Sequence, residues 1–319
     1  MKQMKYLLVL ALTVIIFAAA CGNNSSLDSN NKSSDSGSDS GKDGYKPKEL
    51  TVQFVPSQNA DTLEAKAKPL EKLLSKKLDI PVKVSVSTNY NTIVEAMKSK
   101  KVDVGFLPPT AYTLAHDQKA ADLLLKAHRY GVNEDGSNSK KLVDDYKSEI
   151  LVKKDSGINS LKDLKGKKIA LQDVTSTAGY TFPISTLKEE AGIDATKDMK
   201  IVNVKGHDQA VISLLNGDVD AAAVFQDART IVKKDQPNVF KDTKIIKLTE
   251  PIPNDTISVR PDMDKAFQDK LKKAFKDIAK TKEGHKIISE VYSHEGYTDA
   301  KDSDFDIVRK YEKQVQDMK

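Results

Sequence analysis

Residues 50–107 have the sequence LTVQFVPSQNADTLEAKAKPLEKLLSKKLDIPVKVSVSTNYNTIVEAMKSKKVDVGFL, and this stretch decides the fold. Short runs of alternating apolar residues predict strands, and apolar residues three and four apart predict helices between them. The strands are expected at 50–55, 82–86 and 104–107, and the helices at 60–78 and 92–99. Strands that alternate with helices predict an α/β protein with parallel-type sheets covered by helices.

The same order of elements continues along the rest of the chain. Further strands are expected at residues 149–152, 168–171, 201–204, 221–225, 245–248 and 257–259. Residues 265–318 have helical spacing, with breaks near Glu283 and Gly296. The chain is therefore long enough for two α/β lobes, each with its own core.

One detail repeats within the chain. VEAM at 94–97 and VDVG at 102–105 match VISL at 211–214 and VDAA at 219–222, with the same spacing inside each copy. Each copy predicts a helix, a turn, a Val-Asp pair and a strand. Two lobes built on one plan explain the match, and the alternative is that any helix–strand unit gives this spacing by chance.

The order of the elements predicts one lobe inserted into the other. We expect residues 48–147 with 254–319 to form the first lobe and residues 148–253 to form the second. The chain then crosses between the lobes twice, near 148–154 and near 247–260. Paired crossings form a hinge.

The N-terminal segment predicts export and attachment to a membrane. Lys2 and Lys5 precede an apolar run that ends in three alanines directly before Cys21, the only cysteine. This resembles the lipobox of bacterial lipoproteins, and the alternative for Cys21 is a buried small side chain. We expect a signal peptide at 1–20, lipidation of Cys21, a flexible polar tether over 21–47, and anchoring on the extracytoplasmic face of the cell membrane.

The composition argues against several classes of function. The chain has 51 basic and 46 acidic residues, and the two signs alternate instead of forming the basic stripe that nucleic acid requires. One cysteine gives no disulfide or thiolate zinc site, and the five histidines have no metal-ligand spacing. Nucleophile-elbow, Walker and His-Glu-x-x-His motifs are missing. We expect a binding protein without a cofactor or metal, not an enzyme.

Residues 171–180, LQDVTSTAGY, are the strongest candidate for a binding segment. They follow a predicted strand and open a helical pattern, with adjacent hydroxyls at Thr175, Ser176 and Thr177. The free N–H groups and positive dipole of a helix N-terminus attract anions, and hydroxyls add donors for a tetrahedral oxyanion. The alternative is ordinary helix capping by Ser and Thr.

Several motifs, in order, resemble the phosphonate and phosphite binding proteins of ABC transporters. They are PSQNA at 56–60, TNY at 88–90, the segment 173–179, GH at 206–207, Asp227 and IPND at 252–255. The 173–179 segment resembles the family's Asp-Pro-x-Ser-Thr-Ser-Gly loop, with departures at Val174, where the family has Pro, and at Ala178. The resemblance implies a two-lobed fold of the type II periplasmic-binding-protein kind.

The resemblance also implies roles for eight residues. The hydroxyls of Thr175, Ser176 and Thr177 would hold phosphonate oxygens, and His207 would add a donor. Hydroxyls would also come from Tyr90 and Tyr146, and the ammonium of 2-aminoethylphosphonate would lie between Asp227, which replaces a longer Glu, and Asp255. From the residues alone, Asp255 could instead make a turn, His207 start a helix and Tyr90 pack at an edge.

The implied partners are the permease and ATPase subunits of an ABC importer. One rival hypothesis keeps the fold but changes the ligand to phosphate, phosphite or an alkylphosphonate. Another makes the chain a signalling or adhesive surface lipoprotein. A stripe on the last helix, formed by Val308, Tyr311, Val315 and Met318, predicts either core packing or a dimer seam.

Overall fold

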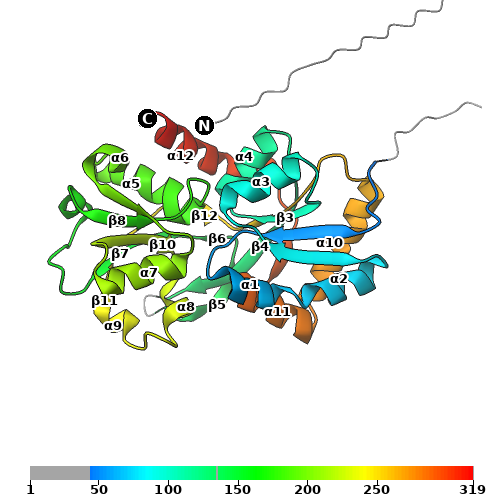
Figure 1. Ribbon diagram of the computed structural model, residues 1–319, viewed down its shortest axis with the longest axis horizontal. Coiled ribbons are helices and arrows are strands. Elements are labelled where there is room, and N and C mark those ends of the chain that lie inside the picture. The colour runs from blue at the N-terminus through cyan, green and yellow to red at the C-terminus, as the bar shows by residue number, and fades with distance from the viewer. Residues whose placement is uncertain (1–43, 134–135, 319) are drawn as a thin grey trace, which may run out of the picture. The chain divides into compact units, whose positions relative to one another are not determined.

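The computed structural model describes residues 44–133 and 136–318 (Figure 1). The expected signal peptide at 1–20, the lipidation site Cys21 and most of the expected tether lie outside these ranges. Within them, no helix combines the length and the apolar character that crossing a bilayer requires.

Residues 44–47, which the sequence places in the tether, contact the folded body instead. The N–H of Tyr45 donates to the carbonyl of Asp262 at 2.7 Å, and its own carbonyl accepts from the N–H of Asp264 at 2.9 Å. The guanidinium of Arg260 lies 3.6 Å from the centre of the Tyr45 ring. Main-chain hydrogen bonds and the contact between Arg260 and the aromatic ring thus attach the end of this segment to the body.

A sheet of seven strands organises what we call the first lobe. Its strands are β1 (Leu50–Phe54), β2 (Val82–Val86), β3 (Val104–Leu107), β4 (Asp122–Val132), β5 (Asn138–Val143), β13 (Thr256–Val259) and β14 (Gly296–Thr298). The order is β14-β4-β13-β3-β1-β2, with β5 paired to β4. Strands β1, β2 and β3 are parallel, whereas β13 runs antiparallel to β3 and β4.

A five-stranded sheet organises the second lobe. Its strands are β7 (Ser148–Lys153), β8 (Lys168–Leu171), β9 (Lys200–Asn203), β10 (Ala221–Phe225) and β11 (Thr243–Leu248), in the order β11-β7-β10-β8-β9. Strand β8 is parallel to β9 and β10, and β7 is antiparallel to β10 and β11. Both sheets therefore contain parallel and antiparallel pairs, whereas the sequence predicted parallel-type sheets. The difference arises because β7 and β13, the strands next to the two crossings, run opposite to their neighbours.

Helices cover both faces of each sheet. They are α1 (Ala60–Ala67), α2 (Leu70–Leu78), α3 (Tyr90–Lys98), α4 (Pro109–Asp117), α5 (Phe182–Ala191), α6 (Ala195–Asp198), α7 (His207–Asn216), α8 (Arg229–Val232), α9 (Val239–Asp242), α10 (Lys265–Ala279), α11 (Lys282–Tyr292) and α12 (Asp306–Gln316). Single-turn helices are η1 (Leu161–Leu164), η2 (Thr177–Thr181) and η3 (Asp302–Phe305). The helix expected over 60–78 is divided at Pro69, which has no N–H to continue the hydrogen-bond pattern.

Four apolar clusters correspond to the four faces of the two sheets. In the first lobe, Phe54 and Phe106 stack with ring centroids 4.1 Å apart beneath α10 and α11. In the second lobe, the alanines of β10 are fully buried and let α7 approach the sheet closely. Each lobe therefore has its own packed interior.

The two crossing segments pair with each other. Strand β6 (Asp145–Tyr146) runs antiparallel to β12 (Ile252–Pro253), forming a two-stranded ribbon between the lobes. Asn254 is fully buried there, with its N–H donating to Asp144 at 3.0 Å and its side chain donating to Val143 at 3.1 Å. Because these strands pair, the two crossing segments lie side by side.

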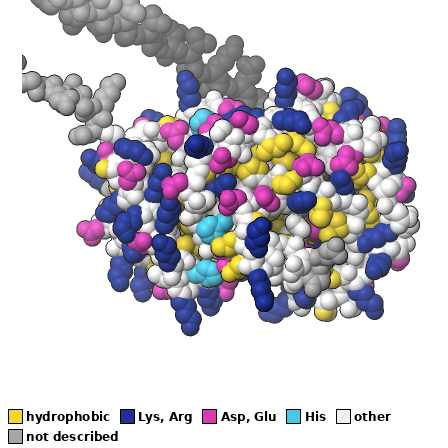
Figure 2. Space-filling model, turned by 180° about the vertical axis from the view of Figure 1, so that it is seen from behind, with side chains coloured by type: hydrophobic (Ala, Val, Ile, Leu, Met, Phe, Trp, Pro, Cys, Tyr) yellow, Lys and Arg dark blue, Asp and Glu magenta, His cyan; other side chains and the backbone are white. Residues whose placement is uncertain are grey.

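Charged side chains of both signs cover the outside of the body. Figure 2, seen from behind, shows Lys and Arg interspersed with Asp and Glu over that face, with apolar side chains between them.

Helix α12 is a third element that links the lobes. Val308 and Tyr311 belong to an apolar cluster of the first lobe, and Val315 and Met318 belong to one of the second. The ring of Tyr311 stacks on Phe182 of α5 with centroids 4.2 Å apart. The apolar stripe is therefore buried in the core and is not a dimer seam.

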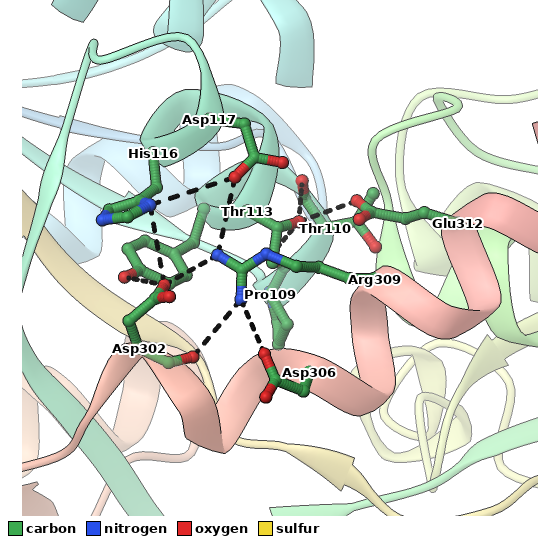
Figure 3. Close-up of polar contacts among 10 residues, drawn as sticks. Pro109, Thr110, Thr113, His116, Asp117, Asp302, Asp306, Arg309 and Glu312 are labelled. Atoms are coloured by element: carbon green, nitrogen blue, oxygen red, sulfur yellow. Dashed lines mark hydrogen bonds and ion pairs between the residues drawn. The ribbon is translucent and has the colours of Figure 1, made fainter.

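Polar contacts fix the other side of α12 to α4 (Figure 3). Arg309 contacts Asp302 at 2.7 Å, Asp306 at 3.2 Å and Asp117 at 3.6 Å. The hydroxyl of Thr113 donates to Glu312 at 2.7 Å. These contacts hold the first half of the helix in the first lobe.

Candidate functional site

A cavity of about 270 Å³ lies between the two lobes. The first lobe contributes Tyr90 to its wall, the crossing ribbon contributes Tyr146, and the second lobe contributes Ser176 and His207. The cavity therefore suits a small solute that touches both lobes at once.

The three adjacent hydroxyls have different environments. Thr175 is turned toward Asp173, whose Oδ1 accepts from its hydroxyl at 2.8 Å and from its N–H at 3.0 Å. Ser176 and Thr177 line the cavity, and Thr175 is not among the described residues that do. The structure thus brings two of the three predicted hydroxyls into the cavity, because the turn at Asp173 uses the first one.

A wide helical turn begins directly at these hydroxyls. Ser176 caps it by accepting from the N–H of Gly179 at 3.2 Å, and the turn η2 has the π-helical pattern that is common at functional sites. The first N–H groups of a helix have no partner within it, so those of Thr177 and Ala178 are available to an anion in the cavity that both residues line.

Close packing favours glycine at position 179. A Cβ atom built on Gly179 would lie 1.5 Å from Oε1 of Gln172 and 2.8 Å from Oγ of Ser176. A side chain at position 179 would therefore have to displace Gln172, which is 1% exposed and tightly packed.

His207 contributes a neutral donor. It begins α7, and its Nδ1 accepts from the N–H of Phe225 at 3.2 Å, which places the proton of the neutral ring on Nε2. Burial lowers the pKa of His207 to about 3, against the opposing effect of the Asp255 carboxylate. The ring therefore offers an N–H to the cavity without carrying a positive charge at neutral pH.

Both predicted tyrosines line the cavity. Tyr90 contacts Ser176, Tyr146 contacts Thr177, and burial raises the pKa of both phenols, so they are neutral. A third tyrosine, Tyr292, was not found from the sequence; its hydroxyl donates to the carbonyl of Val55 at 2.6 Å.

The structure separates the two predicted carboxylates. Asp255 lines the cavity, with its Oδ2 3.6 Å from Nε2 of His294. Asp227 lies at a left-handed turn after β10, with φ of 64°, and accepts from Arg229 at 3.1 Å. It lines a small neighbouring cavity that shares Arg129 and Phe225 with the wall of the first.

Arg129 on β4 is a cavity residue that sequence reasoning missed. Its side chain is 8% exposed, and its Cζ lies 4.8 Å from the centre of the Tyr146 ring. The only available signal was the rarity of arginine, since the chain has four among 51 basic residues.

Comparison with known proteins shows which family the chain belongs to. Residues 52–305 match the family described as "ABC transporter, phosphonate, periplasmic substrate-binding protein". The phosphate-import protein PhnD of Mycolicibacterium smegmatis is 31% identical over 186 residues, and this match spans 56% of each chain, just over half. The phosphonates-binding periplasmic protein of Escherichia coli is 26% identical over 245 residues, or 76% of this chain and 69% of that protein.

Solved structures show the same fold. PhnD1 from Prochlorococcus marinus in complex with methylphosphonate has a TM-score of 0.72 at 21% identity, covering 85% of this chain and 99% of that one. A binding protein of an ABC phosphonate transporter from Pseudomonas aeruginosa has a TM-score of 0.71 at 21% identity, covering 85% and 87%. These likenesses confirm the expected two-lobed α/β fold of the type II periplasmic-binding-protein kind.

The family match extends from β1 to the end of η3 and so includes both sheets, the crossing ribbon and the walls of the cavity. Proteins of this family bind a substrate for a transporter and are not enzymes, as the sequence predicts. The chain therefore belongs to the family of periplasmic phosphonate-binding proteins of ABC transporters.

Proposed function

We propose that this chain captures a phosphonate between its lobes and delivers it to the permease and ATPase subunits of an ABC importer. One observation carries the proposal: the hydroxyls of Ser176 and Thr177 and the neutral ring of His207 line a single cavity at a helix start. Directed donors around a small space suit a tetrahedral oxyanion, since hydrogen bonds to charged acceptors are the strong ones. Burial in the closed cleft strengthens them further.

Closure would be the working motion. Residues 148–253 would move as one body against 48–147 with 254–319, about the ribbon of β6 and β12. Two hydrogen bonds between the lobes support this assignment. The main-chain N–H of His207 donates to the carbonyl of Ser57 at 2.9 Å, and the main-chain N–H of Thr110 donates to the Thr177 hydroxyl at 2.8 Å. A ligand held by both lobes shifts the population toward the closed form, which the permease would recognise.

Lipid anchoring at Cys21 completes the proposed arrangement. After removal of residues 1–20, the acylated cysteine would hold the protein on the extracytoplasmic face of the cell membrane, with the polar segment as a tether. A Cys21→Ser variant should be recovered from the culture medium or the soluble fraction, whereas the wild type stays with membranes. Equal membrane association of both would remove the anchor from the proposal.

The ligand is proposed to be a phosphonate such as 2-aminoethylphosphonate, with its ammonium near Asp255. Asp227 is not among the described residues that line this cavity, and its carboxylate accepts from Arg229. That observation favours a second candidate, in which the same donors hold phosphate, phosphite or an alkylphosphonate. For this candidate Asp255→Asn would leave affinity unchanged, whereas an ammonium site would lose it.

Thermal unfolding of the full chain with 2-aminoethylphosphonate, methylphosphonate, phosphite and phosphate tests the proposal. A ligand at a hundredfold above its dissociation constant stabilises the folded state by about 2.7 kcal/mol. We expect a shift with at least one phosphorus oxyanion and none with sulfate or acetate. Failure of every phosphorus compound to shift the transition would refute the proposed function.

A further inference from the structure

Arg129 is a buried cation that faces the ligand cavity. One terminal N–H group donates to the carbonyl of Tyr292 at 3.0 Å, and among the described residues its Nε has no hydrogen-bond partner. None of the ion pairs among the described residues includes Arg129 either, although other buried arginines such as Arg229 and Arg260 have carboxylate partners. A guanidinium has five N–H donors in a fixed fork, so several remain for a ligand.

Asp255 is its neighbour of opposite charge. The carbonyl of Asp255 accepts from the N–H of Ala127 at 2.9 Å, and Ala127 lies two residues before Arg129 on β4. Arg129 and Asp255 line the same cavity, yet no ion pair within 4.0 Å joins them among the described residues. Two opposite charges that lie close together without pairing are complementary to a ligand that carries both signs on one end.

We propose that Arg129 and Asp255 form a second subsite for an α-amino acid group, so that the ligand is a phosphonate that carries both an ammonium and a carboxylate. This inference rests on the proposed function, in which Ser176, Thr177 and His207 hold the phosphonate. Arg129 binds the carboxylate in the bidentate manner that its planar fork favours. Asp255 accepts from the ammonium.

The arrangement of the cavity fits such a molecule. Tyr146 touches both groups of donors: its hydroxyl contacts Thr177, and the Cζ of Arg129 lies 4.8 Å from the centre of its ring. The phosphonate and the amino acid group would therefore both lie against this tyrosine.

Four probes separate the contributions of the two charges. They are 2-amino-3-phosphonopropionate, which has both groups; 2-aminoethylphosphonate, without the carboxylate; 3-phosphonopropionate, without the ammonium; and methylphosphonate, without either. Isothermal titration of the full chain should rank the first as the tightest ligand. Equal or tighter binding of 2-aminoethylphosphonate would overturn the carboxylate subsite.

Variants assign the effect to Arg129. Arg129→Met should weaken 2-amino-3-phosphonopropionate by about tenfold to a hundredfold, since a charged hydrogen-bonded contact is lost, and leave 2-aminoethylphosphonate unchanged or tighter. Arg129→Lys keeps the charge but not the fork and should lie between the wild type and Arg129→Met. Lys66→Met removes an equal charge from the wall of the same cavity and should not discriminate between the two ligands.

The outcomes separate this inference from the proposed function. Equal weakening of all four ligands by Arg129→Met would mean that Arg129 supports the phosphonate or the fold, and the amino acid subsite would fall. The same discrimination in Lys66→Met would reduce the effect to general electrostatics and would also overturn it. If no phosphonate binds the wild type, the proposed function itself fails.

Discussion

Replacing His207 by asparagine or by glutamine separates two roles of the ring. In the structure Nδ1 accepts from the N–H of Phe225 at 3.2 Å, and Nε2 is left to donate into the cavity. The oxygen of an asparagine can take the place of Nδ1 but leaves no donor at the Nε2 position. The nitrogen of a glutamine can reach the Nε2 position but leaves the Phe225 N–H without its partner.

The expected magnitudes follow from these contacts. A hydrogen bond to a charged oxyanion contributes about 1.5–3 kcal/mol, so His207→Asn should weaken phosphonate binding by about tenfold to a hundredfold while keeping most of the stability. A buried N–H without a partner costs about 1–3 kcal/mol, so His207→Gln should lower the free energy of unfolding by that amount and keep most of the affinity.

Titration calorimetry and urea unfolding of the two variants measure both quantities. If both substitutions reduce affinity and stability in parallel, the assignment of the two ring nitrogens is wrong. The pH dependence gives a second check, because burial lowers the pKa of His207 to about 3 and the ring stays neutral above pH 5. Acidification from pH 7.5 to 5.5 should therefore change affinity equally in the wild type and in His207→Asn. A gain confined to the wild type would show that a charged imidazolium binds the ligand.

Three further predictions concern the fold around the site. Gly179→Ala places a Cβ 1.5 Å from Oε1 of Gln172, so both the melting temperature and the phosphonate affinity should fall, and an unchanged affinity would mean that the loop can shift freely. Tyr311→Ala removes a ring stacked on Phe182 and should cost about 3–5 kcal/mol of unfolding free energy in a denaturant titration, whereas a cost under about 1 kcal/mol would contradict its core role. Burial raises the pKa of Glu149 from 4.5 to about 8, so the folded chain binds a proton that the unfolded chain has released. The stability of the wild type should therefore fall, relative to Glu149→Gln, as the pH rises from about 5 to 8. Parallel stability curves for the two proteins would contradict this.

Strands with a clear apolar pattern were predictable from the sequence. The expected limits agree with β2, β3, β8 and β10 to the residue. Strands β4 and β5 were not found, because β4 pairs with different partners along its length and has no simple alternation of buried and exposed side chains. Antiparallel pairing could not be predicted from the order of elements alone, since it depends on where the chain crosses between lobes.

The cavity was predictable to the extent that local motifs determine it. The loop at Ser176 and Thr177 and the helix start at His207 carry their own signals in sequence, and the structure brings these residues together. Asp227 lies at a neighbouring cavity, because a left-handed turn directs it toward Arg229. Arg129 has no motif around it, since its position depends on the sheet pairing of β4.

The double membership of α12 has a consequence for folding. Val308 and Tyr311 complete one apolar cluster, while Val315 and Met318 complete another in the second lobe, so one helix supplies part of two interiors. If one lobe unfolds, the apolar side chains of α12 that it buried become exposed, while the other lobe still holds the rest of the helix. The two lobes should therefore melt in one cooperative transition. During synthesis, which proceeds from the N-terminus, neither interior is complete until residues 308–318 have emerged.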